Sequence, residues 1–268
     1  MSVLRVGVIN LMPEAERYEA MLSRVLGRAA FHLPDARDAK DAHAVQPVWI
    51  RLRDARYASS DHDHLARTYR SFGETDDDEK LDGLIVTGAP VETLPYEDVF
   101  YFRELATIAG AARTRGLPTL GLCWGGLALG KLLGIEKVRY AQKLFGVYPL
   151  RMRDDGSTVH CAQSRHAGID DAVLEHAEAR GEVRLLAHGA QSGYSVFESA
   201  DGLWTAHLGH PEYELARLVF EYRRDRAAGR TDVIAPVGVD LTDPPRAPET
   251  HGPRFFAAWL AKLGARRA

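Results

Sequence analysis

The stretch LPTLGLCWGGLALGKLLG (residues 117–134) decides the fold. Its first part, residues 117–123, is a short apolar run that ends on a cysteine, and residues 124–134 continue without a loop. The first part predicts a buried strand, and the second predicts the helix that follows it. A strand that runs straight into a helix is the repeating unit of parallel α/β sheets.

The same alternation of strand and helix is predicted on both sides of this stretch. Before it, we expect strands at 3–11, 45–52 and 81–90, and helices at 13–26, within 61–72 and at 97–115. After it, we expect strands at 144–152, 182–189, 194–199 and 203–209, and a helix at 214–229. The pattern predicts the α/β class, with an open, mostly parallel sheet flanked by helices.

The C-terminal region is Pro-rich and then apolar. Residues 240–253 predict a loop that wraps over the protein and helps to close its site, and residues 254–265 predict a closing helix. We see no internal repeat and no low-complexity linker. We therefore expect a single domain over residues 1–268, with 240–268 as a C-terminal wrapping loop and helix.

Composition and charge limit the classes of function. The chain has 268 residues, with 34 basic and 37 acidic side chains and a formal net charge of −3. This balance does not favour nucleic acid or an anionic membrane as a partner. No apolar run is long enough to span a bilayer, and the N-terminus lacks the features of a signal peptide. With only Cys123 and Cys161 present, we expect no disulfide framework and a cytoplasmic location.

Cys123 is the candidate nucleophile. Gly121, Cys123 and Gly125 form the pattern GxCxG between the predicted strand and helix, which is the cysteine form of the nucleophile elbow. Such a turn holds the thiol above the carboxyl edge of the sheet, where ligands bind in open α/β folds. The helix N-terminus predicts a lowered thiol pKa, and the amide of Trp124 can donate to an oxyanion. The alternative is a buried structural cysteine, which is our interpretation of Cys161.

A nucleophilic thiol needs a base, and the segment TAHLGHPEYE (205–214) supplies a candidate. His210 and Glu212 follow the predicted end of a strand. Residues two apart in an extended chain point to the same side, and Pro211 between them stiffens the backbone. We predict a set in which Cys123 is the nucleophile, His210 the base and Glu212 the group that orients the imidazole. The alternative is a histidine in a surface loop.

The other histidines are weaker candidates. His62 and His64 have no matching cluster of cysteines or carboxylates, so we expect a solvated segment and no metal site. His166 follows Ser164 and Arg165 in a stretch that predicts a loop, from which side chains often bind ligands.

Several segments in series resemble the homoserine O-acyltransferase family of methionine biosynthesis, the branch with a class I glutamine amidotransferase-like (flavodoxin-like) fold. They are INLMP (9–13), LDGLIVTGAPVE (81–92), GLCWGG (121–126), KLFGVY (143–148), SRH (164–166), GHPEYE (209–214) and EYRRD (221–225). The chain departs from the family at Glu14 and Ala15, where lysines are common, and at Leu127, where glutamine is common. Residues 27–80 match poorly, and their role is not defined by the resemblance.

The resemblance implies roles for individual residues. Cys123, His210 and Glu212 correspond to the family's catalytic set. Lys143 is implied to lie near the acyl-CoA, and Ser164 and Arg224 to hold the amino-acid substrate, whose carboxylate a guanidinium can bind with two hydrogen bonds.

Glu92 occupies the family position that is tied to the choice of acyl group. Glutamate there goes with acetyl-CoA and glycine with succinyl-CoA. The rule has a physical basis, because a carboxylate in the pocket would repel the succinyl carboxylate. The alternative is that Glu92 only begins a loop or helix.

The resemblance thus predicts an O-acyltransferase that moves an acetyl group (favoured by Glu92) or a succinyl group to L-homoserine through a cysteine acyl-enzyme. Acetyl-CoA or succinyl-CoA would be a co-substrate, and no permanent cofactor and no metal would be needed. L-serine as acceptor, a glutamine amidotransferase-type amidase and a binding protein without activity are the alternatives. The partners of the protein would be its small-molecule substrates, acyl-CoA and L-homoserine or L-serine. A homodimer fits a metabolic enzyme, although no stretch of sequence defines its interface.

Overall fold

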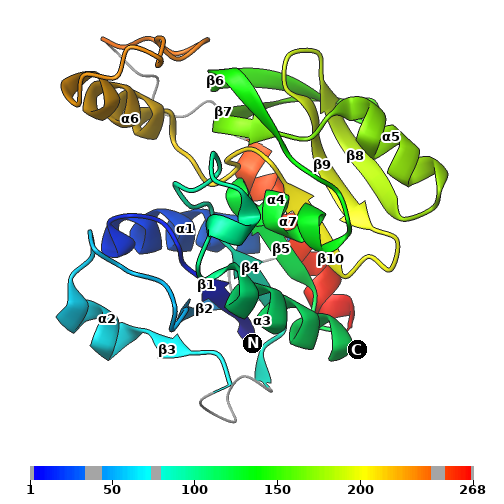
Figure 1. The fold of residues 1–268 in the computed structure, drawn as a ribbon. Helices are drawn as coiled ribbons and strands as arrows, with labels where there is room; N and C mark the ends of the chain where they lie inside the picture. Colours follow the sequence, from blue (N-terminus) through cyan, green and yellow to red (C-terminus); the bar gives the residue numbers. More distant parts are fainter. Residues whose placement is uncertain (1–2, 34–43, 74–79, 243–250, 267–268) are drawn as a thin grey trace.

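The computed structural model describes residues 3–33, 44–73, 80–242 and 251–266 (Figure 1). These residues contain a ten-stranded sheet. Its strands, in spatial order, are β3 (Arg70–Ser71), β2 (Ala44–Arg51), β1 (Val3–Ile9), β4 (Gly83–Val86), β5 (Thr119–Leu122), β10 (Trp204–His207), β9 (Gly193–Ser199), β8 (Val183–Gly189), β6 (Val138–Met152) and β7 (Thr158–Gly168). The pairs from β3 to β10 are parallel, and the pairs from β10 to β7 are antiparallel.

Helices cover both faces of the parallel part. The helices of the described residues are α1 (Ala15–Ala30), α2 (His62–Thr68), the 3-10 helix η2 (Tyr96–Asp98), α3 (Phe102–Thr114), α4 (Trp124–Leu132), α5 (Asp171–Ala179), α6 (Leu215–Ala227) and α7 (His251–Ala265). On one face, Leu22 of α1 and Leu260 of α7 pack in the cluster that contains Val8. On the other face, Leu105 of α3 and Ala128 of α4 pack with Ile9 and its neighbours. The prediction of a mostly parallel sheet flanked by helices is confirmed.

The antiparallel part of the sheet holds two elements that the sequence does not predict, β7 and α5. Residues 164–166, predicted as a loop, lie within β7. The strand is hidden in the sequence by polar residues that are nevertheless buried: Arg165 donates from Nε to Gln163 Oε1 at 2.9 Å and from Nη2 to the Ser192 carbonyl at 2.6 Å. Because Arg165 and Gln163 satisfy part of each other's hydrogen bonding, a polar stretch can form a buried strand at the edge of the sheet.

Two helix boundaries also differ from the prediction. The helix expected over residues 97–115 is divided into η2 and α3. The C-terminal helix begins at His251, so the predicted loop over 240–253 extends too far. Residues 243–250 of that loop lie outside the described residues. The described helix α7 packs against α1 and β1. Among the described helices, none is both long and apolar enough to cross a membrane.

The contact between α4 and the end of β4 leaves no room for a side chain at Gly125. A Cβ there would lie 2.2 Å from the Val86 carbonyl oxygen. We expect Gly125→Ala to lower the free energy of unfolding by about 1–3 kcal/mol, as overpacking does. Gly110→Ala is the matched control, because a Cβ on this helical glycine of α3 would meet no atom within 4 Å. Gly110→Ala should raise the free energy of unfolding by up to about 1 kcal/mol. Urea denaturation measures both, and equal effects would contradict the packing argument.

Candidate active site

Four parallel strands end at one edge of the sheet and bring the sequence motifs together. β1, β4, β5 and β10 are neighbours and run in the same direction. Their last residues are Ile9, Val86, Leu122 and His207. The segments that follow, residues 10–13, 87–93, 123 and 208–212, therefore meet at the carboxyl edge, where open α/β sheets bind ligands.

The loops after β1 and β4 are fixed to each other by hydrogen bonds. The Thr87 amide donates to the Ile9 carbonyl at 3.1 Å, and the Leu11 amide donates to Thr87 Oγ1 at 2.8 Å. The Met12 amide donates to the buried Asn10 Oδ1 at 3.1 Å. The motifs INLMP and TGAP thus form one hydrogen-bonded unit at the sheet edge. Their polar residues, Asn10 and Thr87, supply the side-chain acceptors that join it.

Cys123 stands on a strained turn between β5 and α4. Its φ is 49° and its ψ is −113°, a conformation that non-glycine residues rarely adopt. The Cys123 amide donates to the His207 carbonyl at 2.8 Å, which ties the turn to β10. A Cβ on Gly121 would lie 2.4 Å from the Gly125 carbonyl oxygen, so glycine is required where the turn is tightest. This geometry is that of the predicted nucleophile elbow.

The three residues of the predicted catalytic set are in contact in the structure. The Cys123 and His210 side chains line the same pocket, and each shifts the pKa of the other. His210 Nδ1 is 2.8 Å from Glu212 Oε1, and the Tyr18 hydroxyl donates to the same oxygen at 3.2 Å. The His210 amide donates to the Ala162 carbonyl at 2.8 Å, so β7 holds the backbone that carries the imidazole. The arrangement can transfer a proton between a thiol and an imidazole that a carboxylate orients.

Burial opposes ionisation of the thiol. It raises the pKa of Cys123, and His210 lowers it again by charge and hydrogen bond. The sequence predicted a lowered pKa from the helix N-terminus, and this direction is wrong because Cys123 is only 4% exposed and lies near two carboxylates. Burial also disfavours charge on His210, but Cys123 and Glu212 raise the pKa of the imidazole well above its usual value. The proton therefore belongs to a coupled pair.

A pocket of about 260 Å³ opens over this set. Its walls include, besides Cys123 and His210, all four side chains predicted to contact substrates, which are Glu92, Lys143, Ser164 and Arg224. The Trp124 side chain points elsewhere: its ring packs edge-on against Tyr101 with centroids 5.6 Å apart. Only the backbone amide of Trp124, the first of α4, remains a candidate donor to an oxyanion.

Glu92 lies beside the thiol. Its Oε2 is 3.9 Å from Cys123 Sγ, and its Oε1 accepts a hydrogen bond of 2.8 Å from the His166 amide in β7. Burial raises the pKa of this carboxyl group. The side chain is thus held in the pocket beside the Cys123 sulfur.

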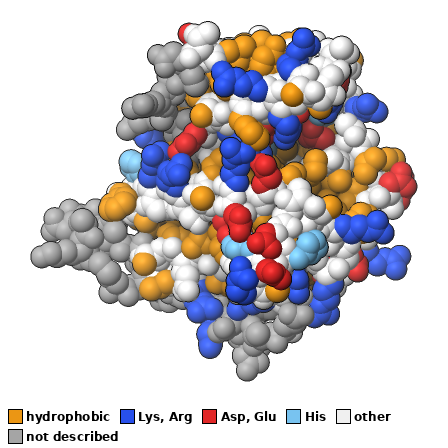
Figure 2. Space-filling view, turned by 90° about the vertical axis from the view of Figure 1, so that its left-hand side faces the viewer, with side chains coloured by type: hydrophobic (Ala, Val, Ile, Leu, Met, Phe, Trp, Pro, Cys, Tyr) orange, Lys and Arg blue, Asp and Glu red, His pale blue; other side chains and the backbone are white. Residues whose placement is uncertain are grey.

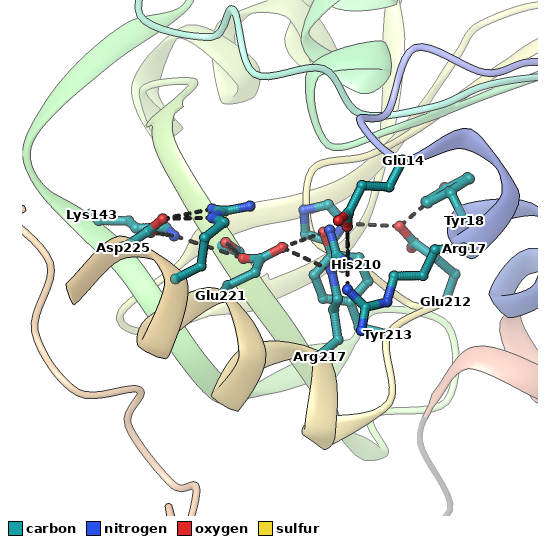
Figure 3. A network of polar contacts seen from close by, with 12 residues as sticks. Glu14, Arg17, Tyr18, Lys143, His210, Glu212, Tyr213, Arg217, Glu221 and Asp225 are labelled. Carbon is teal, nitrogen blue, oxygen red and sulfur yellow. Dashed lines mark hydrogen bonds and ion pairs between the residues drawn. The ribbon is translucent and has the colours of Figure 1, made fainter. Parts of the chain in front are cut away.

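A buried carboxylate that the sequence analysis missed, Glu221, organises the far wall of the pocket (Figure 3). It accepts hydrogen bonds from Ser164 Oγ at 2.6 Å, from the Tyr213 hydroxyl at 2.8 Å and from Arg217 Nε at 3.2 Å. Burial alone would raise its pKa, but Lys143 and its other partners lower it. The Tyr213 ring stacks on His210 with centroids 3.9 Å apart, so this network also positions the imidazole. Its signal was present in the motif EYRRD, whose first residue is Glu221.

Asp225 holds both basic residues predicted at this wall. Buried Lys143 Nζ is 3.4 Å from Asp225 Oδ2 and 3.8 Å from Glu221 Oε2. Arg224 donates from Nε and Nη2 to Asp225 Oδ1 at 2.9 and 2.7 Å. Its side chain is still 47% exposed, and a guanidinium has donors left for a further partner.

Cys161, His62 and His64 lie outside the pocket, whereas His166 lines it. Cys161 is buried, and burial raises its thiol pKa strongly. His62 and His64 lie on α2, where His64 Nε2 is 2.9 Å from Glu19 Oε1. Within the described ranges, no group of three or more His, Cys, Asp or Glu side chains could hold a metal ion.

Charges of both signs share the face of the protein seen in Figure 2. Basic and acidic side chains are interspersed there and do not separate into large patches of one sign. A mixed surface of this kind gives no broad positive field for a nucleic-acid backbone.

Comparisons with known proteins point to one family. The chain matches the family model described as homoserine O-succinyltransferase over residues 1–265. It is 31% identical to a homoserine O-acetyltransferase of Bacillus mycoides and 31% identical to one of Clostridium novyi, in both cases over 96% of this chain and 84% of the relative.

Solved structures with a similar fold are glutamine amidotransferases. One from Thermotoga maritima has a TM-score of 0.60 and 12% identity, and the match covers 99% of this chain and 98% of that one. One from Methylobacillus flagellatus has a TM-score of 0.55 and 13% identity over 99% and 94% of the two chains. The predicted class I glutamine amidotransferase-like fold is confirmed.

The contact between His210 and the thiol predicts how alkylation of Cys123 depends on pH. Because His210 lowers a thiol pKa that burial raises, His210→Gln should move the midpoint of the iodoacetamide rate profile upward by about 1–3 pH units. Cys161→Ala is the control and should leave the profile unchanged. Mass spectrometry of the alkylated peptide gives the rate, and an unshifted midpoint in His210→Gln would refute the coupling.

Proposed function

Because the chain belongs to the homoserine O-succinyltransferase family, we propose that it is an acyl-CoA-dependent O-acyltransferase that acetylates the hydroxyl of L-homoserine in methionine biosynthesis. The observation that carries this proposal is the grouping of Cys123, His210 and Glu212: the first two line one pocket, and Glu212 Oε1 lies 2.8 Å from His210 Nδ1. A thiol is a suitable nucleophile for this donor, because exchange of one thioester for another is nearly balanced in energy.

In the first half-reaction, Cys123 gives its proton to His210, and the sulfur attacks the carbonyl carbon of the acyl-CoA thioester. The tetrahedral intermediate collapses, the bond to the CoA sulfur breaks, and His210 returns the proton to the departing thiolate. Glu212 accepts the Nδ1–H of the imidazole and stabilises its charged form. The products are free CoA and an acetyl-Cys123 thioester.

In the second half-reaction, His210 removes the proton from the acceptor hydroxyl, and the oxygen attacks the acyl-enzyme carbonyl. The bond to Cys123 Sγ breaks, and His210 returns the proton to the sulfur. In both steps the oxyanion would be stabilised by the amide of Trp124 and an amide of the loop 87–91. The burial of Cys123, His210 and Glu212 limits access of water, which would otherwise hydrolyse the intermediate.

The wall opposite the thiol suits an amino acid. Arg224 offers free guanidinium donors for its carboxylate. The carboxylates of Glu221 and Asp225 face the same pocket and supply negative charge for its ammonium group. Ser164 donates a hydrogen bond to Glu221 and lines the same pocket, so its hydroxyl can orient the chain of the acceptor.

The acyl-enzyme is the direct test of the mechanism. Incubation with acetyl-CoA should add the mass of one acetyl group to the protein, and addition of L-homoserine should remove it. Cys123→Ala should show no adduct, whereas the matched variant Cys161→Ala should behave as the wild type. Intact-mass spectrometry reads all of these outcomes.

Two results would overturn this proposal. An adduct that persists in Cys123→Ala would exclude this nucleophile, and release of ammonia from glutamine without acyl transfer would assign the chain an amidase activity. Discharge by L-serine in place of L-homoserine would correct the acceptor.

The position of Glu92 predicts the choice of donor. A succinyl group on Cys123 would bring its carboxylate close to the Glu92 carboxylate, which is 3.9 Å from the sulfur. We expect Glu92→Gly to raise the ratio of kcat/KM for succinyl-CoA over acetyl-CoA at least about 10-fold, equivalent to about 1.4 kcal/mol. Glu92→Gln separates charge from size, and Glu97→Gln is the control outside the pocket. An unchanged ratio in Glu92→Gly would contradict the assignment.

A further inference from the structure

The basic side chains of the pocket differ in whether a carboxylate already neutralises them. Lys143 and Arg224 pair with Asp225, and Arg217 pairs with Glu221. Arg230, at the mouth, pairs with Asp232.

Arg139 also lines the pocket, yet its side chain has no ion-pair or hydrogen-bond partner within the described part of the chain. Its guanidinium is therefore available for an anion from a ligand.

The strand that carries Arg139 is held in place by contacts with β7. Arg139 pairs with Ala167 in the register of β6 and β7, and the register shifts before the next pair, Leu144 with Arg165. Bulges of this kind turn side chains toward a site. Tyr140, next in sequence, is anchored because buried Arg165 donates from Nη1 to its hydroxyl at 3.0 Å. The exposed guanidinium thus extends from a fixed strand at the pocket.

The residues that line the pocket differ in exposure. Cys123 is buried, whereas Arg139 is exposed. A thioester donor must bring its sulfur to Cys123. The phosphates of this donor are charged and costly to bury, so we expect them at the exposed part of the pocket wall. A guanidinium is the side chain best suited to bind phosphate, with two parallel hydrogen bonds.

We propose that Arg139 binds a phosphate group of the acyl-CoA donor and so determines the affinity for it; this inference rests on the proposed function. Arg139 contacts no reacting atom in this scheme. It acts on binding of the donor and leaves binding of the acceptor unchanged.

The test compares two donors, one with the phosphates and adenosine of CoA and one without them. With acetyl-CoA, Arg139→Ala should raise KM about 10- to 100-fold at unchanged kcat, as expected for loss of a charge-assisted pair. With S-acetylpantetheine, which lacks the adenosine and its phosphates, the same variant should match the wild type. Arg139→Lys should recover part of the loss, because it keeps the charge but not the paired geometry. The KM for L-homoserine should not change.

The control lies on the same strand. Arg151 is exposed on β6 and is not part of the pocket wall, so Arg151→Ala should leave both donors unaffected. An equal loss with both donors, or no loss with either, in Arg139→Ala would overturn the inference while the acyl-enzyme of the wild type still supported the proposed function. If the wild type formed no adduct with either donor, the proposed function itself would fail.

Discussion

The site depends on a backbone contact that admits no side chain, the approach of α4 to the end of β4 at Gly125. The Val86 carbonyl lies where a Cβ would be, and this closeness sets the start of α4 directly above the sheet. The turn before it must then reverse within one residue, which places Cys123 at a positive φ. The strain is local, and it is maintained because the Cys123 amide is bound to β10 and the helix is packed in the core. The backbone therefore fixes the Cβ of Cys123 at the pocket, whose wall this residue forms.

The proposed base, His210, is held by contacts from α1, from β7 and from Tyr213. Tyr18 of α1 supports Glu212, Ala162 of β7 binds the backbone of His210, and Tyr213 stacks on its ring. Tyr213 in turn donates to Glu221 of α6, which also fixes Ser164. The network in Figure 3 therefore joins the imidazole to the wall proposed for the acceptor. A displacement of α6 would therefore shift both the His210 imidazole and Ser164.

The parts of the site that could be predicted from sequence are those encoded locally. The glycines around Cys123 and the short spacing from His210 to Glu212 each describe a geometry within a few residues. Tyr18 could not be assigned in this way, because its partner Glu212 is 194 residues away. The strand β7 was missed for a related reason: Gln163 and Arg165 look solvated until their buried partners are known. The sign of the Cys123 pKa shift required burial, which a helix N-terminus seen in sequence does not report.

The charges around the sulfur suggest why this site suits acyl transfer. A thiolate at Cys123 would lie near Glu92 and Glu212, with His210 as the nearest cation, so the neutral thiol is favoured at rest. Under the proposed function, acylation by acetyl-CoA would replace this neutral thiol by a neutral thioester, so the sulfur would stay uncharged beside both carboxylates. A succinyl group would instead bring a new negative charge into the buried space next to Glu92.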